Sequence, residues 1–292
     1  MKILITGGTG FLGRSLCAAL LEQGHAVTVL SRQSADAVGR LCGGQVKPLS
    51  DLAAWRREEV FDAVVNLAGA PVFDRHWSAA RKTLLWESRV GFTQRLVARM
   101  AETGAPPQVL LSASAVGIYG DCGERALTEE AAPAEDFLGR LCAAWEAAAM
   151  GSGRLGVRVC LLRTGLVLHA SGGMLRRMRL PFRCGLGARL GDGRQWMSWI
   201  GLEDWVGVAM MLLEDGGAAG AYNLTAPQPV TNAEFTAALA QAVHRPALAS
   251  APAWLLRGLL GERASMLLGS QRALPQKALM SGYRFKKAKL AF

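Results

Sequence analysis

A glycine-rich stretch near the start of the chain, TGGTGFLG (Thr6 to Gly13), joins two segments of different periodicity. The preceding KILIT predicts a short buried strand, and the following FLGRSLCAALLEQG has the apolar spacing of a helix that stops at Gly24. A strand that passes through glycines directly into a helix is typical of a dinucleotide-binding turn. No other feature of the sequence constrains the fold as much, because this turn belongs to a parallel strand–helix–strand unit.

Two glycine spacings fit the turn. Gly8, Gly10 and Gly13 satisfy one pattern, and Gly7, Gly10 and Gly13 satisfy the other. In either case the glycines permit a tight turn, close approach of a pyrophosphate and close packing of the helix on the strand. The first N–H groups of the helix carry partial positive charge, which favours a phosphate. The alternative is a glycine-rich turn without a ligand. The residues expected to contact the cofactor here are Gly7, Gly10, Phe11, Leu12 and Gly13.

The end of the next predicted strand, HAVTVLSR, indicates which dinucleotide is bound. NAD-selective folds place an acid there to bind the ribose 2′-hydroxyl, whereas this chain has Ser31 and Arg32 and no acid before Asp36. Arg32 is suited to pair with a 2′-phosphate, and Ser31 is suited to donate a hydrogen bond to it. The sequence therefore favours NADP(H) over NAD(H), against the alternative that Arg32 is an ordinary solvated side chain.

Strand and helix patterns alternate along the first half of the chain. Strands are predicted in HAVTVL, VFDAVVNLA, QVLLSAS and VRVCLLRTGLVL, and helices over residues 79–103 and in DFLGRLCAAWEAAAM. This alternation predicts an α/β fold with a doubly wound parallel sheet of the Rossmann type and right-handed crossovers. We assign residues 1–168 to a dinucleotide-binding domain and residues 169–292 to a smaller C-terminal α/β lobe, some of which is free to cross back into the first sheet.

The segment HASGGMLRRMRLPFRCGLGARLGDGRQ lacks a clear period, and we expect a long loop or lid there. Nine arginines and one acid, Asp192, lie between Arg154 and Arg194 in a chain of net charge +10. This cluster is either a solvated surface or a site of attraction for an anionic ligand, such as a phosphate-bearing substrate. No recognised nucleic-acid-binding module accompanies the charge, so we expect no nucleic-acid partner.

The composition argues against several other classes of protein. The 292 residues are 51% hydrophobic and 19% charged, which suits one large α/β domain or a domain with a smaller lobe. The sequence has no long apolar run of the kind found in signal peptides and membrane spans. The six cysteines include no C-x-x-C pair, and no two of the four histidines are close in sequence. We therefore expect no metal site and a reducing, cytoplasmic location.

Several segments resemble the extended short-chain dehydrogenase/reductases, the NAD-dependent epimerase/dehydratase superfamily. They are TGGTGFLG, VVNLAG, SASAVGIYG, LLRTGLVL, SWIGLEDWVGVA and GAYNLT, which together cover nearly the whole chain. The segments VTVLSR, WESRVGFTQRLV, PFRCGLGARLGDGRQ and LPQKALMSGYRF are similar to a poorly characterised branch labelled epimerase family protein. The resemblance implies cofactor contacts from Leu67, Ala68 and Gly69, and from Arg89 and Val167. The alternatives are a surface charge at Arg89 and a core position at Val167.

The same resemblance reveals a missing catalytic pair. Members of the superfamily use a tyrosine and, four residues later on the same helix, a lysine that lowers the pKa of the phenol. Aligned on Glu146, those two positions are Leu138 and Cys142 in this chain, and no lysine occurs between Lys82 and Lys277. Epimerisation by the usual tyrosine route is therefore disfavoured.

Ser114 and Tyr119, in the segment SASAVGIYG, are the candidate catalytic residues. We favour Ser114 over Ser112 as the group that hydrogen-bonds a substrate carbonyl. The alternative is that both serines cap the strand end and that the tyrosine packs. Further candidates for proton transfer are Asp136, Glu146, which we expect at the surface, and Cys142, which we expect to be a buried apolar filler.

Two functions stay open. We favour an NADP(H)-dependent oxidoreductase or epimerase-like enzyme whose small-molecule substrate binds between the sheet and the smaller lobe, beneath residues 176–194. The alternative is a non-catalytic protein in which NADPH stabilises a surface for a partner. The segment QWMSW (Gln195 to Trp199) is either an apolar wall of the site or part of the core. We expect a monomer or a homodimer.

Overall fold

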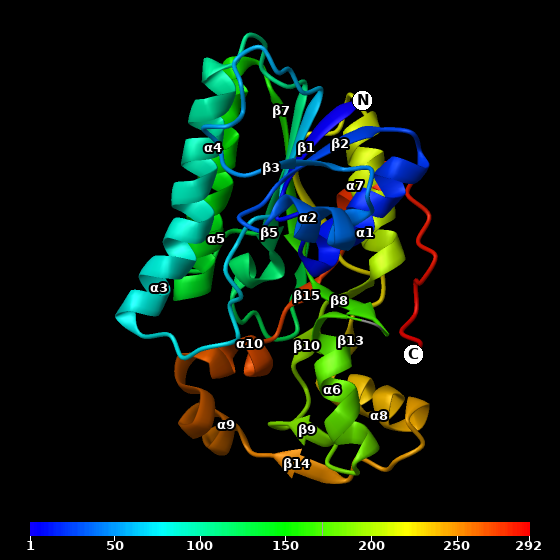
Figure 1. Cartoon of the computed structure of the whole chain (residues 1–292). Coiled ribbons are helices and arrows are strands. Elements are labelled where there is room, and N and C mark those ends of the chain that lie inside the picture. The colour runs from blue at the N-terminus through cyan, green and yellow to red at the C-terminus, as the bar shows by residue number, and fades with distance from the viewer. Residues whose placement is uncertain (171) are drawn as a thin grey trace.

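The centre of the molecule is a parallel sheet with strand order β12-β7-β5-β4-β1-β2-β3. The computed structural model describes residues 1–170 and 172–292. Helices cover both faces of the sheet (Figure 1). The strands are β1 (Lys2–Thr6), β2 (Ala26–Leu30), β3 (Lys47–Leu49), β4 (Ala63–Asn66), β5 (Val109–Ala115), β7 (Arg158–Thr164) and β12 (Gly220–Leu224). The doubly wound α/β fold expected from the sequence is confirmed.

The two faces of the sheet have separate cores, because successive side chains of a strand point to opposite faces. Ile3 and Ile5 of β1 belong to a core with α1 (Phe11–Glu22), α2 (Ala35–Cys42) and α7 (Leu202–Glu214). Leu4, between them, belongs to a core with α4 (Phe92–Glu102) and α5 (Phe137–Met150) on the other face. Strands buried on both sides explain why the sheet segments read as continuous apolar runs.

The long helix predicted over residues 79–103 contains an irregular turn. It consists of α3 (Ala79–Trp86), a π-helical turn at Glu87–Gly91, and α4, in direct succession. A π-helical turn interrupts the regular hydrogen-bond pattern of a helix and is often found at functional sites. Here the turn carries Arg89, which is 9% exposed, toward the carboxyl ends of the strands.

A smaller lobe lies beyond the carboxyl ends of the sheet strands (Figure 1). It contains α6 (Gly173–Arg183), α8 (Asn232–Ala242), α9 (Ala253–Leu260) and α10 (Ser265–Leu268), with the strand pairs β9 (Ala188–Leu190) with β14 (Ala249–Ala251) and β10 (Trp196–Met197) with β13 (Val230–Thr231). Two further pairs, β8 (Leu166–His169) with β11 (Trp199–Gly201) and β6 (Ala126–Leu127) with β15 (Arg272–Ala273), connect it to the sheet. The helix α7 and the strand β12 return to the sheet, where β12 pairs with β7 and α11 (Gln276–Met280) contacts it.

The expectation of a long loop over residues 170–195 is wrong for the described residues of this segment, and residue 171 lies outside them. Gly173–Arg183 forms α6 although Pro181 lies inside it, and Ala188–Leu190 forms β9. Leu175 and Phe182 recur at helical spacing and belong to one core with Trp199 and Phe235. Burial of this apolar stripe outweighs the helix-breaking signals of the glycines and the proline.

Candidate functional site

The glycine turn packs against the loop that follows β4. Gly7 has a φ of +69°, and a Cβ atom there would lie 2.7 Å from the carbonyl carbon of Leu67. A Cβ atom on Gly13 would lie 2.4 Å from the carbonyl oxygen of Gly7, so only glycine lets α1 approach this closely. Gly10, by contrast, is exposed at the N-cap of α1. The turn is therefore closed on its inner side and open outward, where the first N–H groups of α1 lack acceptors within the helix.

Buried polar side chains fix the strand ends beside this turn. The Thr6 hydroxyl donates to Asn66 Oδ1 at 2.7 Å, and Asn66 Nδ2 donates to Thr93 Oγ1 at 2.8 Å and to Ser112 Oγ at 3.4 Å. These residues come from β1, α4, β4 and β5, and all of them are buried. These hydrogen bonds fix the strand ends beside the crevice between β1 and β4. The strand order reverses at this crevice, which is where dinucleotides bind in sheets of this type.

Arg89 lies beside the loop that carries Leu67, Ala68 and Gly69. Its Nη2 donates to the carbonyl of Ala70 at 2.9 Å, and its Cζ lies 3.1 Å from where a Cβ atom on Gly69 would be. Burial lowers the pKa of Arg89 to about 10. The alternative of a surface charge at Arg89 is wrong, because its buried guanidinium lies against Gly69 and Ala70 in the loop after β4.

The smaller lobe reaches the glycine turn through Phe11. A Cβ atom on Gly172 would lie 2.3 Å from the Phe11 ring, so the start of α6 rests on this side chain. Val167, in β8, is 9% exposed and belongs to the core against which Phe11 and Leu12 pack. The fold thus brings Val167 close to the turn while it also occupies a core position.

Ser31 and Arg32 directly follow β2 at the same edge of the sheet. Thr6 pairs with Leu30 across β1 and β2, so Ser31 follows β2 where Gly7 follows β1. The Ser31 N–H donates to the carbonyl of Leu49 at 2.9 Å, its hydroxyl oxygen accepts from the Gln33 N–H at 3.2 Å, and Arg32 is exposed. Together with the open glycine turn, this arrangement fits a dinucleotide with a phosphorylated ribose.

A cavity of about 990 Å³ lies between the sheet and the smaller lobe. Ser114, Leu138 and Cys142 line it from the sheet side, and Met174, Trp196 and Leu267 are among the residues that line it from the lobe. Both positions of the missing Tyr–Lys pair therefore face the cavity as apolar groups. Burial raises the pKa of the Cys142 thiol to about 12, which agrees with the expectation of a buried filler.

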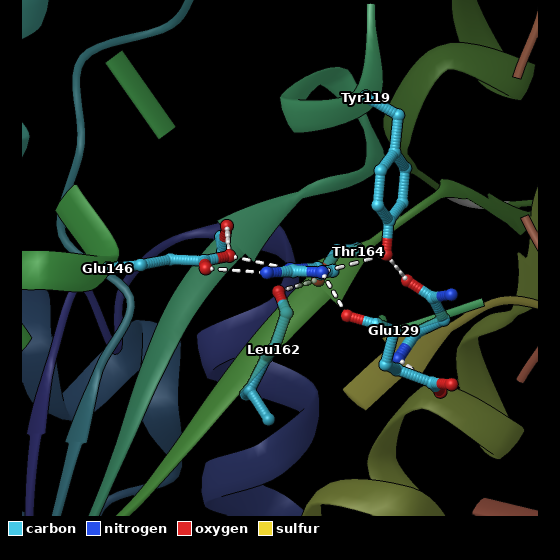
Figure 2. A network of polar contacts seen from close by, with 8 residues as sticks. Tyr119, Glu129, Glu146, Leu162 and Thr164 are labelled. Atoms are coloured by element: carbon cyan, nitrogen blue, oxygen red, sulfur yellow. Dashed lines mark hydrogen bonds and ion pairs between the residues drawn. The ribbon is translucent and has the colours of Figure 1, made fainter. Parts of the chain in front are cut away.

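Glu146 and Tyr119 belong to a buried network of polar contacts (Figure 2). The Ser114 hydroxyl donates to Glu146 Oε1 at 2.6 Å. Arg163, in β7, donates to the same carboxylate through Nε at 2.8 Å and Nη2 at 2.9 Å. Although burial opposes it, the Glu146 carboxylate raises the pKa of Arg163 above the usual value for arginine. The bidentate contact fixes the positions of both Glu146 carboxyl oxygens.

Tyr119 lies on the far side of Arg163 from Glu146 (Figure 2). Its hydroxyl donates to Asn223 Oδ1 at 2.7 Å and accepts from Arg163 Nη1 at 3.0 Å. It is 2% exposed, and burial raises its pKa against the lowering effect of Arg163. The fold therefore brings Ser114 to the cavity, whereas it places the Tyr119 hydroxyl inside the network and Ser112 inside the strand-end cluster.

The expectation that Glu146 is a surface residue is wrong, because Glu146 is only 7% exposed and forms an ion pair with Arg163. Arg163 was not among the expected site residues. A signal for both exists in the sequence: Glu146 is the one charge in LCAAWEAAAM, Arg163 is the one charge in VCLLRTGLVL, and the two charges are opposite. Buried charges of this kind are almost always paired.

The arginine-rich segment does not cover the cavity with its charges. Met174, Met178 and Leu190 of this segment line the cavity, whereas Arg176 and Arg183 of α6 are exposed. That the substrate binds beneath residues 176–194 stays a prediction, and this segment lines the cavity with apolar side chains, not with guanidinium groups. Each alternative for the QWMSW segment holds for one tryptophan: Trp196 lines the cavity, and Trp199 is buried in the core of the lobe.

An open glycine turn and a serine-lined cavity at the ends of a parallel sheet define a dinucleotide-binding protein of the short-chain dehydrogenase type. The NAD dependent epimerase/dehydratase family matches residues 3–225, and the chain belongs to this family. A domain of unknown function matches residues 251–291.

Within residues 1–170 and 172–292, no helix has the length and apolarity to cross a membrane. Over the same residues, His, Cys, Asp and Glu side chains form no group of three or more that could hold a metal.

The relatives are similar to the chain over almost its whole length. An epimerase family protein of Mycobacterium bovis is 41% identical over 97% of this chain and 93% of its own length. The epimerase family protein YfhF of Bacillus subtilis is 38% identical over 100% of this chain and 96% of its own length. The crystal structure of the human epimerase family protein SDR39U1 with NADPH has a TM-score of 0.89 at 33% identity, covering 99% of this chain and 96% of that one. The resemblance to the epimerase family branch is confirmed.

Proposed function

We propose that the protein is an NADP(H)-dependent oxidoreductase in which Ser114, Glu146 and Arg163 take the place of the Tyr–Lys pair. The observation that carries the proposal is the 2.6 Å hydrogen bond from the cavity-lining Ser114 to the buried Glu146 carboxylate. When bound, the nicotinamide cofactor would supply or accept a hydride. The human relative crystallised with NADPH and the exposed Arg32 both support NADP(H) as that cofactor.

Specific residues would hold the cofactor in the crevice between β1 and β4. The N–H groups of Phe11, Leu12 and Gly13 would bind the pyrophosphate, because they lie at the N-terminus of α1. Ser31 and Arg32 would bind the ribose phosphate. The residues proposed for the remaining contacts are Gly7, Gly10, Leu67, Ala68, Gly69, Arg89 and Val167.

The hydrogen bond that the Ser114 hydroxyl donates determines how this residue would contact a substrate. A serine hydroxyl has one proton, and here this proton is donated to Glu146. The Ser114 oxygen is then free to accept a hydrogen bond from a substrate hydroxyl. As the substrate O–H breaks, its proton passes to the Ser114 oxygen and the Ser114 proton passes to Glu146, which ends neutral. In the opposite direction the protonated Glu146 returns the proton by the same route.

Arg163 and Tyr119 would act as positioning residues. Arg163 fixes both carboxylate oxygens of Glu146, and Tyr119 fixes Arg163 from the other side. A rigid carboxylate aligned with Ser114 loses little energy to reorganisation when the proton moves. In this proposal Glu146 accepts the proton through Ser114, so the reaction needs neither the lysine nor the cavity-facing tyrosine of the superfamily.

Single-turnover oxidation of NADPH tests the proposal against a panel of aldehydes and ketones that includes uncharged compounds and nucleotide keto-sugars. We expect at least one compound to oxidise bound NADPH, and Ser114→Ala to lower that rate by about 10²–10⁴. The matched control Ser152→Ala removes a buried hydroxyl that donates to the Ala149 carbonyl, outside the cavity lining, and should keep the rate. An equal loss in both variants would contradict the role of Ser114.

A second candidate function is a non-catalytic, NADPH-dependent binding protein. The apolar Leu138 and Cys142 at the cavity wall favour it, because they leave no acid–base group at the usual positions. Strong thermal stabilisation by NADPH, without oxidation by any compound of the panel, would be the result expected for this candidate.

For either function we propose the cytoplasm as the location, because the six cysteines are free thiols.

A further inference from the structure

The part of the cavity beyond Ser114 is lined mainly by flexible apolar side chains. Met174 and Met178 reach it from α6, Trp196 and Met197 from β10, and Leu267 and Leu268 from α10. Thioethers and leucines adapt their shape to apolar ligands and offer no strong hydrogen bonds. The volume of about 990 Å³ is large enough for a nicotinamide ring and a further molecule.

The carboxylates that line the cavity are already engaged by the protein. Asp136 accepts from the Gly139 N–H at 2.7 Å as the N-cap of α5. Asp121 accepts from the Ser270 N–H at 3.1 Å. Glu262 forms an ion pair with Lys82 at 2.5 Å. These groups stabilise helix ends and loops, so each of them already has a hydrogen-bond or ion-pair partner within the protein.

The cations that line the cavity are too few for a pyrophosphate. Arg89 donates to the Ala70 carbonyl and lies on the proposed cofactor side. Arg257, in α9, is an exposed arginine at the lining. A nucleotide sugar carries two negative charges, and burying them near Asp121, Asp136 and Glu262 without matched cations would be costly.

The charged face of α6 points away from the same space. The helix repeats every 3.6 residues, so Met174 and Met178 lie one above the other on one face. Arg177 pairs with Asp74 at 2.8 Å, with 66% of its side chain exposed. The segment that gives the chain much of its positive charge therefore presents methionines, not guanidinium groups, to the cavity.

We propose that this part of the cavity binds an uncharged, mainly apolar molecule that carries one hydroxyl or carbonyl group, and that it does not bind nucleotide sugars. The apolar body contacts Met174, Met178 and Leu267, and its oxygen reaches Ser114. The inference rests on the proposed function only in assigning that oxygen to Ser114. Binding of the apolar body follows from the lining alone.

Equilibrium binding to the NADPH-saturated protein tests this inference, with 2-undecanone as the uncharged probe and UDP-glucose as the charged one. We expect 2-undecanone to bind at least about tenfold more tightly than UDP-glucose. Met174→Glu should weaken 2-undecanone binding by about tenfold or more, because it places a charge in the apolar lining. Met280→Glu, at a methionine that is 78% exposed, is the matched control and should leave binding unchanged.

Leu267→Glu, in α10, provides a second test from another element of the cavity lining, and NADPH titration checks that each variant retains the fold. Tighter binding of UDP-glucose, no binding of 2-undecanone, or a 2-undecanone affinity that both cavity variants leave at the value of the unmodified protein would overturn the inference. Binding of 2-undecanone that responds to both variants, without any oxidation of NADPH, would support the inference and contradict the proposed function. The two proposals therefore fail in distinguishable ways.

Discussion

The proposed site has a nucleotide half at the glycine turn and a reaction half at Ser114, and the two are built by different means. The nucleotide half is shaped by backbone: the glycine turn, the first N–H groups of α1 and the loop after β4 meet because side chains are absent at Gly7 and Gly13. The reaction half is shaped by side chains from three elements, Ser114 of β5, Glu146 of α5 and Arg163 of β7. A short motif can encode the first half, whereas the second depends on contacts between distant parts of the sequence. Family membership is thus a good guide to the first half and a weaker guide to the second.

The largest effect is expected from breaking the ion pair of the reaction half. Arg163→Met would leave the Glu146 carboxylate buried without its partner, and we expect a loss of about 3–5 kcal/mol in the free energy of unfolding. Urea denaturation at neutral pH measures this loss. Arg95→Met is the control, because its ion pair with Glu87 is exposed on both sides and worth about 0–1 kcal/mol at most. Equal stability of the two variants would show that the buried pair contributes little.

The nucleotide half can be broken separately at Gly13. Gly13→Ala places a Cβ atom 2.4 Å from the Gly7 carbonyl oxygen, so α1 and the turn must move apart. We expect NADPH affinity, measured by fluorescence titration, to fall by about 100-fold, or about 2.7 kcal/mol. Gly39→Ala, in α2, adds the same methyl group where no atom lies within 4 Å, and should keep the affinity. An affinity within a few-fold of the unmodified protein in Gly13→Ala would contradict a pyrophosphate site at the turn.

These two halves also differ in how well the sequence predicts them. The strand-to-helix setting of TGGTGFLG correctly predicts β1 and α1, because local periodicity and glycine spacing determine both. The pairing of Glu146 with Arg163 joins segments seventeen residues apart through the packing of α5 on the sheet, and no local rule reports it. The loop expected over residues 170–195 fails for a related reason: burial of Leu175 and Phe182 in the lobe overrides Pro181.

The choice between the two nicotinamide cofactors is expected to depend on Arg32. Arg32→Ala should weaken NADPH binding by about tenfold, or about 1.4 kcal/mol, and leave NADH binding unchanged, because only NADPH carries the 2′-phosphate. Parallel fluorescence titrations with both cofactors measure the difference. Arg40→Ala removes another exposed arginine from the same region and serves as the control. Equal weakening of NADPH and NADH binding would rule out a specific role for Arg32.

The smallest expected effect concerns Cys142, which occupies the position of the missing lysine. Burial raises the pKa of its thiol from 9.0 to about 12, so the folded protein favours the protonated form. The resulting contribution to stability is fully present below pH 9 and is lost as the pH rises toward 12. Mass spectrometry after brief iodoacetamide treatment at pH 8 should find the exposed Cys184 modified and Cys142 unmodified. Modification of both at similar rates would contradict a buried, unreactive Cys142.

The proposed replacement of the Tyr–Lys pair by Ser114, Glu146 and Arg163 is tested most directly by the single-turnover rate of NADPH oxidation in two isosteric variants. Glu146→Gln removes the group that exchanges a proton with Ser114, whereas Tyr119→Phe removes a hydroxyl that contacts only the network behind it. With the most reactive carbonyl compound of the panel, we expect Glu146→Gln to be slower by about 10²–10⁴ and Tyr119→Phe by less than about tenfold, with NADPH affinity unchanged in both. A rate that survives in Glu146→Gln and is lost in Tyr119→Phe would contradict this assignment and return the acid–base role to the tyrosine.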